Sequence, residues 1–202
     1  MNTPKSKLEE TIINESLRLF KKRGITAVRM DDVAKELRMS KRTLYEHFED
    51  KEQLLLECIR QDAEKRAVAY ENYAKNSKGV MDMLCYYLRN ALDEFSQCNM
   101  NFYIELQKYQ RVRDYIDGIK QRDKATHDRF IRTAIEDGLL LDSVNFELLH
   151  IINKTAMDFL IREKLYERYS FREIFNTFMM VFIRGLLTEK GLAEFNKYAK
   201  MT

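Results

Sequence analysis

The chain has 202 residues, of which 45% are hydrophobic and 33% charged, so it can bury a core and is not a disordered segment. Its formal net charge of +3 is too small to indicate a partner by itself. One proline and six glycines supply few turns, which excludes strand-rich folds and favours long helices.

The cysteines and the apolar runs indicate where such a protein resides. Cys58, Cys85 and Cys98 are an odd number and lie within helical apolar patterns, so we interpret them as reduced core residues. The longest apolar run, 178–183, is far shorter than the ~20 residues that span a bilayer. Because the chain also begins with polar and charged residues, the sequence predicts a soluble, cytoplasmic protein with no membrane partner.

Three short helices are predicted in the first part of the chain. Ser6 and Glu9 have the spacing of a capping box, and the helix that they open is expected to end at Gly24. A second helix fits residues 31–37, and a tight turn then leads to Ser40, which can cap a third. This order is typical of a helix-turn-helix.

The third helix, residues 41–48, has an unusually polar circumference. At about 100° per residue, Leu44 and Phe48 point inward, whereas Arg42 and Glu46 face away. Two flanks remain, and their side chains can donate hydrogen bonds; they are Lys41 and Tyr45 on one side and Thr43 and His47 on the other. Such a helix suits the major groove of double-stranded DNA, with cations near guanine edges and hydroxyls near phosphates. The alternative interpretation is a solvated face without a partner.

Residues 6–60 resemble the DNA-binding domain of the TetR (tetracycline repressor) family of transcriptional regulators. The resemblance rests on GITAVRMDDVAKELRMSKRTLYEHFEDKEQLL, in particular its T-L-Y-x-x-F core and the Lys51-Glu52 pair. Carried over by position, it implies a set of DNA-contacting residues: Arg29, Met30, Ser40, Lys41, Arg42, Thr43, Tyr45, His47 and Lys51. The turn residue, often glycine in the family, is Arg38 here, so a left-handed backbone at this position would cost about 1 kcal/mol.

The remainder is predicted to be a larger helical domain. Asp50 and Gln53 open a fourth helix that runs to about Lys75, and the others are expected near 79–97, 101–109, 111–137, 145–167 and 171–190. The fold class is therefore all-α, with an N-terminal three-helix helix-turn-helix domain at 1–50 that continues into a connecting helix at about 50–75. Residues 76–202 form the predicted effector-binding and dimerisation domain.

The helix at 171–190 carries apolar residues in nearly every direction, so a partner is needed to bury it unless it is an internal core helix. Pairing with 145–167 across a twofold axis gives a four-helix homodimer interface, which the family resemblance also implies. Its predicted residues are Phe159, Phe175, Phe178, Met179, Phe182 and Leu186.

Methionines and aromatic residues are frequent in the central helices, where they can fill a core or line an adaptable apolar pocket. The resemblance implies a pocket for a small-molecule effector, and its predicted lining is Met81, Tyr87, Phe95, Phe102 and Tyr103.

No catalytic grouping, cofactor motif or metal site is predicted. Asp123 and His127 share a helix face, but they make at most half a metal site, and an ion pair is favoured. The resulting hypothesis is a repressor that binds a near-palindromic operator as a dimer and is released by a small apolar or amphipathic ligand. The alternative is a helical protein-interaction adaptor that binds an acidic partner through its basic N-terminal face.

Overall fold

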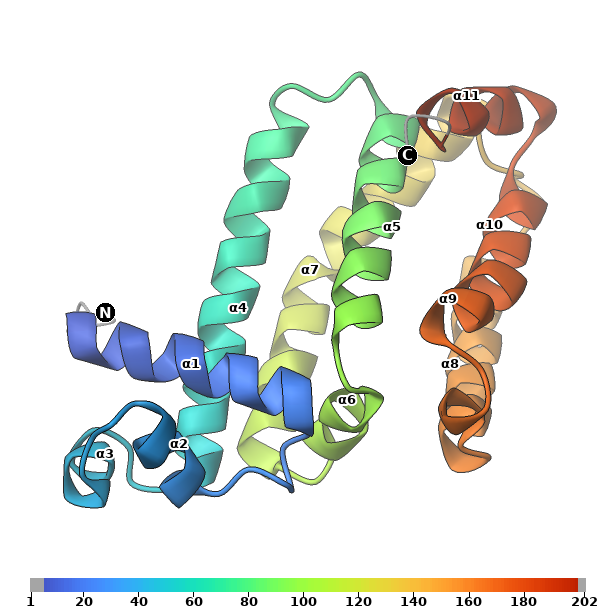
Figure 1. Ribbon diagram of the computed structural model, residues 1–202. Coiled ribbons are helices and arrows are strands. Elements are labelled where there is room, and N and C mark those ends of the chain that lie inside the picture. Colours follow the sequence, from blue (N-terminus) through green and yellow to red (C-terminus); the bar gives the residue numbers. More distant parts are fainter. Residues whose placement is uncertain (1–5, 200–202) are drawn as a thin grey trace. The chain divides into compact units, whose positions relative to one another are not determined.

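The computed structural model describes residues 6–199, and the regular elements in this range are all helical, as predicted (Figure 1). In chain order they are α1 (Lys7–Arg23), α2 (Met30–Glu36), α3 (Lys41–His47), α4 (Lys51–Ala74), α5 (Val80–Gln97), α6 (Met100–Leu106), α7 (Gln110–Glu136), α8 (Phe146–Arg162), η1 (Leu165–Glu167), α9 (Phe171–Ile174), η2 (Phe175–Met179), α10 (Met180–Leu186) and α11 (Glu189–Ala199). The outer ends of the two predicted domain ranges, 1–5 and 200–202, lie outside the described residues.

The described chain divides into two compact units that do not follow chain order. The first unit comprises 6–72 and 97–122, and the second comprises 73–96 and 123–199. The first unit therefore holds α1 to α3, nearly all of α4, α6 and the first half of α7. The predicted functional division near residue 75 stays a prediction.

Helix α1 begins and ends as its sequence predicts. Ser6 Oγ accepts a hydrogen bond from the Glu9 amide, and the Glu9 carboxylate accepts one from the Ser6 amide, which completes the capping box. At the other end Gly24 has φ +84°, and its N–H donates to the Phe20 carbonyl.

The core of the first unit joins the N-terminal helices to a segment that comes much later in the chain. Buried side chains of α1, α2, α3 and α4 pack in one cluster with others from α6 and α7. Among these are Phe20, Val33, Leu44, Leu54, Phe102 and Val112. The helix-turn-helix is therefore built on a base that includes residues from 102 to 112.

The second unit has a smaller core, formed by buried residues of α5, η2 and α11 and by Leu139 and Leu187. Its later helices differ from prediction. The expected helix at 145–167 ends at Arg162, because Lys164 adopts a left-handed backbone with φ +51° and only the short η1 follows.

The expected helix at 171–190 ends at Leu186 and contains a π-helical stretch, η2, between α9 and α10. Gly191 directly follows the predicted helix end at 190, but it lies within the unpredicted helix α11. A Cβ atom there would lie 2.0 Å from the Leu139 carbonyl oxygen, so glycine permits close packing at this point.

Candidate nucleic-acid interface

The turn between α2 and α3 is closed by a left-handed residue. Arg38 has φ +51°, and the amides of Arg38 and Met39 donate to the carbonyls of Lys35 and Ala34 at 3.1 and 3.0 Å. This confirms that a non-glycine residue takes the strained position, which costs about 1–2 kcal/mol. Ala34 is buried at the same place, and its small side chain lets the two helices approach closely.

Two apolar residues hold α3, as predicted. Leu44 and Phe48 are buried in the core of the first unit, and Ser40 Oγ accepts a hydrogen bond from the Thr43 amide at 3.0 Å. Arg42 points away from the core, with 89% of its side chain exposed. One cap and two anchors therefore fix the helix and leave most of its surface open.

The cations of α3 are paired only with exposed carboxylates. Lys41 Nζ lies 2.5 Å from Asp31, and Arg42 Nε lies 3.0 Å from Glu46. Exposed ion pairs of this kind contribute about 0–1 kcal/mol, so a phosphate or a base edge can replace the carboxylate at little cost. Both side chains are thus available to an external anion or acceptor.

The remaining α3 residues have different surroundings. Tyr45 is exposed, whereas Thr43 Oγ1 lies 2.9 Å from Ser40 Oγ. His47 Nδ1 lies 3.2 Å from the Glu9 carboxylate and so connects α3 to α1. Hydrogen bonds from the Ser6 amide and from His47 hold the pKa of Glu9 below its usual value. His47 therefore positions α3 as well as lying on its surface.

The two residues predicted to contact DNA at the start of α2, Arg29 and Met30, have different surroundings. Arg29 is exposed at the N-cap, and its amide donates to the Asp32 carboxylate at 2.8 Å. Met30 is only 7% exposed and packs in the core, so the prediction of a DNA contact through its side chain is wrong. An apolar residue in the first turn of a short helix serves as an anchor here.

Lys51 has contacts inside the first unit. Its Nζ donates to the Ile25 carbonyl at 2.5 Å and lies 6.0 Å from the centre of the Phe20 ring. Burial lowers the pKa of this lysine. Its ammonium is therefore partly engaged inside the unit, and the predicted phosphate contact stays a prediction.

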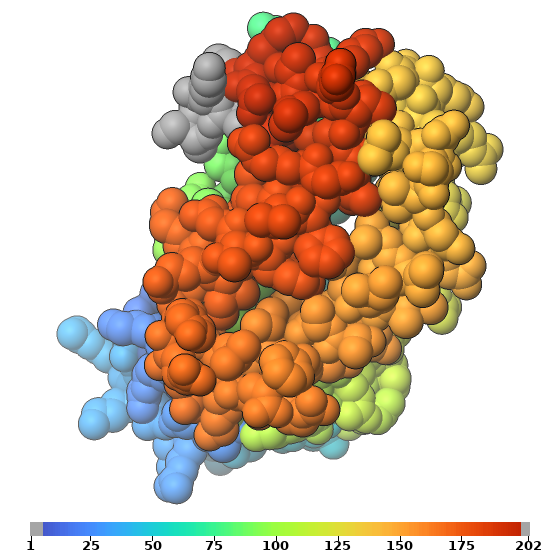
Figure 2. Space-filling model, turned by 90° about the vertical axis from the view of Figure 1, so that its right-hand side faces the viewer, coloured from blue at the N-terminus to red at the C-terminus, as the bar shows by residue number. Residues whose placement is uncertain are grey.

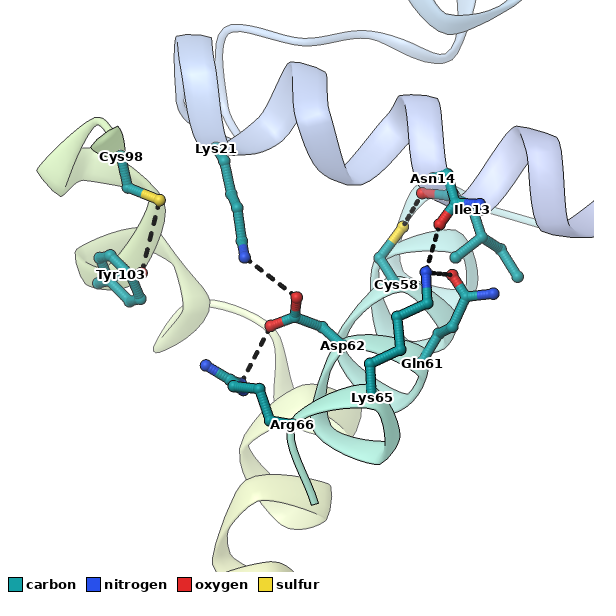
Figure 3. A network of polar contacts seen from close by, with 10 residues as sticks. All are labelled: Ile13, Asn14, Lys21, Cys58, Gln61, Asp62, Lys65, Arg66, Cys98 and Tyr103. Atoms are coloured by element: carbon teal, nitrogen blue, oxygen red, sulfur yellow. Dashed lines mark hydrogen bonds and ion pairs between the residues drawn. The ribbon is translucent and has the colours of Figure 1, made fainter. Parts of the chain in front are cut away.

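A polar network joins α1 to α4 (Figure 3). Asp62 lies 3.1 Å from Lys21 Nζ on α1 and 3.1 Å from the guanidinium of Arg66, so one carboxylate holds two cations. Nearby, Lys65 Nζ donates to Asn14 Oδ1 at 2.8 Å. The Lys21–Asp62 and Lys65–Asn14 contacts join residues that are 41 and 51 positions apart, so no local sequence pattern indicates them.

The predicted effector residues divide between the two units. Phe102 and Tyr103 belong to the first unit, where Phe102 is buried in the core. In the second unit Met81 is buried, Phe95 stacks on Phe171 at 4.8 Å between ring centres, and Tyr87 is exposed. The effector pocket stays a prediction, and Met81 and Phe102 already fill the cores of their own units.

The predicted dimer residues lie on or beside an apolar face of the second unit. Figure 2 looks onto the segment from α8 through α10, coloured orange to red. Phe159 is exposed, and Phe178, Met179, Phe182 and Leu186 are half-buried. Phe175 is buried against Phe171 in the unit's own core, which removes its side chain from the predicted interface.

Exposed apolar residues extend this face along α8, within the segment 145–167 that was predicted to pair with 171–190. They are Leu148, Ile151 and Ile152, of which the sequence reasoning missed only Ile151. Together with Phe159, Leu160, Leu165 and Phe178, residues Ile151 and Ile152 line an apolar hollow of about 560 Å³. None of the α8 residues is fully buried, although the helix is predominantly apolar. The signal was the run FELLHIINKTAMDFLI, whose apolar residues cover more than one face.

Two properties of the described residues bear on other classes of protein. No helix is long and apolar enough to cross a membrane, and no three metal-ligating side chains come together, both within residues 6–199.

The arrangement of α2, the turn and α3 defines a helix-turn-helix protein. Residues 12–58 match the family described as bacterial regulatory proteins, tetR family. The HTH-type transcriptional regulator YvaF of Bacillus subtilis (strain 168), itself uncharacterized, is 31% identical over 103 residues, which cover 50% of this chain and 54% of YvaF. The chain thus matches about half the length of this curated relative.

Solved structures extend the likeness to nearly the whole fold. A protein from Saccharomonospora viridis, described as a transcriptional regulator in complex with choline, has a TM-score of 0.73 and 20% identity over 92% of this chain and 100% of its own. A TetR-family regulator from Marinobacter aquaeolei VT8 has a TM-score of 0.67 and 21% identity over 96% and 99%. The helix-turn-helix is thus similar to that of the tetR family over residues 12–58, and the fold resembles that of a solved TetR-family regulator over nearly the whole chain.

Proposed function

We propose that this protein is a cytoplasmic DNA-binding transcriptional regulator whose helix α3 reads bases in the major groove. The observation that carries the proposal is the exposure of α3, which two apolar side chains, Leu44 and Phe48, anchor to the core. Arg42, which faces directly away from those anchors, is the expected base-contacting residue. Lys41, Thr43, Tyr45 and Arg29 are the expected neighbours that contact bases or phosphates.

The test begins with an inverted repeat upstream of the protein's own gene. Binding to this duplex and to a random duplex is measured over a range of salt concentrations. Arg42→Ala is expected to weaken cognate binding about tenfold or more, with a much smaller change on random DNA, because a lost guanine contact removes about 1–3 kcal/mol of discrimination.

Arg18→Ala is the matched control, because Arg18 is also an exposed arginine paired with glutamates in the first unit, but on α1. It should leave the preference for the cognate duplex unchanged. Equal losses for Arg42→Ala on both duplexes would contradict the base contact. A protein that binds no duplex at low salt, but binds an acidic protein, would instead support the adaptor alternative.

We further propose that the regulator acts as a homodimer on a near-palindrome. The exposed apolar face of α8, with Phe159, Phe178, Met179, Phe182 and Leu186 on or beside it, supports this proposal, because exposed apolar patches mark sites of association. A twofold axis would then place two α3 helices about 34–36 Å apart, one per half-site.

The last part of the proposal is that the protein represses transcription and that a small apolar or amphipathic ligand relieves this repression. Support comes from the match of residues 12–58 to the tetR family and from the solved neighbour in complex with choline, which is a property of that protein. A ligand that tilts α4 would move the attached helix-turn-helix and lower operator affinity. A broad panel in which no compound changes operator affinity, or a gene deletion that lowers transcription from the operator, would overturn this element.

A further inference from the structure

The loop between α1 and α2 determines where the helix-turn-helix begins. Gly24 has a left-handed backbone, and the Val28 amide donates to the Ile25 carbonyl at 3.2 Å, which forms a turn. Ile25 and Val28 are both buried. Because α2 follows directly and is joined to α3 by a tight turn, the position of this loop sets the position of α3.

Two charged side chains hold this loop, one from α4 and one from α6. Lys51 Nζ donates to the Ile25 carbonyl, and the Glu105 carboxylate accepts a hydrogen bond from the Thr26 amide at 2.7 Å. Burial alone would raise the pKa of Glu105, but hydrogen bonds from Thr26 and Ile25 bring it below the usual value. Glu105 is therefore ionised at neutral pH, when its hydrogen bonds are strongest.

The fit between α6 and the loop is close. A Cβ atom at Gly24 would lie 3.3 Å from both Asn101 Cβ and Glu105 Oε2, and the Asn99 amide donates to the Lys21 carbonyl at 2.8 Å. Glu105 also lies 3.8 Å from Lys108 within its own segment, and its charge acts on Lys51, the other side chain that holds the loop. The contact to Thr26 spans 79 residues, so it is not local capping.

We propose that Glu105 is a positioning residue for DNA recognition: its carboxylate on α6 fixes the loop before α2 and thereby the orientation of α3. This inference rests on the proposed function and adds α6 to the parts that recognition requires. Loss of the carboxylate would leave α3 folded but less well oriented, so operator affinity falls even among folded molecules.

The experiment compares operator affinity of wild type, Glu105→Gln and Glu105→Ala, with the folded fraction of each measured by circular dichroism and thermal melting. Both variants are expected to bind about tenfold more weakly, because a hydrogen bond to a charged group is lost or weakened. The isosteric Glu105→Gln retains the shape of the side chain if Glu105→Ala does not fold.

Glu52→Gln is the matched control. Glu52 also accepts a backbone hydrogen bond, from the Arg111 amide at 2.9 Å, and also joins two helices of the first unit, α4 and α7. This hydrogen bond does not involve the loop, so Glu52→Gln is expected to change thermal stability without changing operator affinity. Amide exchange at Thr26, measured without DNA, should be faster in Glu105→Gln than in wild type and unchanged in Glu52→Gln.

A second variant, Thr26→Pro, tests the same contact from the side of the loop. Proline suits the second position of a turn, and it removes both the amide hydrogen and the hydroxyl that reach Glu105. The hydrogen bond from Ile25 remains, so in this background Glu105→Gln is expected to have a smaller further effect on affinity than in wild type, and fully additive losses would overturn the contact to Thr26 as the cause.

The outcomes separate the two proposals. A wild-type protein that binds no duplex overturns the proposed function and this inference with it. Wild-type binding together with unaltered affinity in both Glu105 variants overturns this inference alone.

Discussion

The two units bury their apolar residues to very different extents. In the first, α1 to α4, α6 and the start of α7 close around one cluster that includes Phe20, Leu44 and Phe102. In the second, neither α8 nor α10 has a fully buried residue, and Ile151 and Ile152 are exposed. Both units are helical and each has a buried core, but the second leaves two apolar helices, α8 and α10, without a buried side chain.

This difference in burial suits the two units to different roles, namely holding α3 and associating with a second surface. A closed core holds α3 in a fixed position, which a base-reading helix requires. An apolar helix with no buried residue requires a second surface to cover it, and the proposed homodimer supplies that surface. The variants below test whether the first unit is indeed closed and whether the second unit is indeed open.

The largest expected change is in the free energy of unfolding, and it concerns the α6 residue Phe102 in the core of the first unit. Phe102→Ala should lower the free energy of unfolding by about 3–5 kcal/mol, because a fully buried phenylalanine leaves a cavity. Tyr87→Ala, at an exposed aromatic position of the second unit, should cost less than about 1 kcal/mol. Urea denaturation of both variants measures the difference, and similar losses would contradict the placement of Phe102 in the core.

The next effect concerns the open face of α8. Ile151 is 55% exposed, and Ile151→Glu should weaken dimerisation about 100-fold by placing an unpaired charge in the interface. Val68→Glu is the control, since Val68 is 56% exposed but lies on α4 in the first unit. Sedimentation over a concentration series compares them, and a wild-type monomer at every concentration would refute the homodimer.

A smaller gain is expected at the turn before α3. Arg38→Gly removes the strain of a left-handed non-glycine backbone and should raise the free energy of unfolding by up to about 1 kcal/mol. Thermal melting of the two proteins provides the measurement. A loss of stability would show that the arginine side chain contributes more than its backbone strain costs.

The smallest effect is a pH dependence in the second unit. A hydrogen bond from the Tyr73 hydroxyl lowers the pKa of Asp82 below its ordinary value of 3.8. A depressed carboxyl pKa gives stability that is present above the ordinary pKa and is lost as the pH falls through the folded value. Asp82→Asn should therefore be less stable than wild type at pH 7, and the difference should shrink below about pH 4. A difference that does not change with pH would exclude this linkage.

The sequence predicted those features that depend on residues close together in the chain. Leu44 and Phe48 were identified as the anchors of α3 from helical spacing, and Ser6 and Gly24 were identified as the ends of α1 from capping chemistry. The family resemblance identified Arg38 as the turn residue at which a left-handed backbone would be strained, and the structure has φ +51° there.

What the sequence could not predict depends on partners that are distant in the chain. The ammonium of Lys51 looked available because its partner, the Ile25 carbonyl, lies 26 residues away. Glu105 carried no pattern at all, since its contact spans 79 residues. Helix α11 was missed because Gly191 is typical of a helix end, whereas here the glycine permits contact with Leu139.

The first unit consists of two separate chain segments, which limits how this protein can be re-engineered. A chimaera that carries only the helix-turn-helix and α4 into another protein would lack Phe102, Leu106 and Val112. These three residues pack in the same buried cluster as α1 to α4. It would also lose the Glu105 contact to the loop before α2. The transferable cassette is therefore two pieces of chain, 6–72 and 97–122, and a functional hybrid needs both from the same parent.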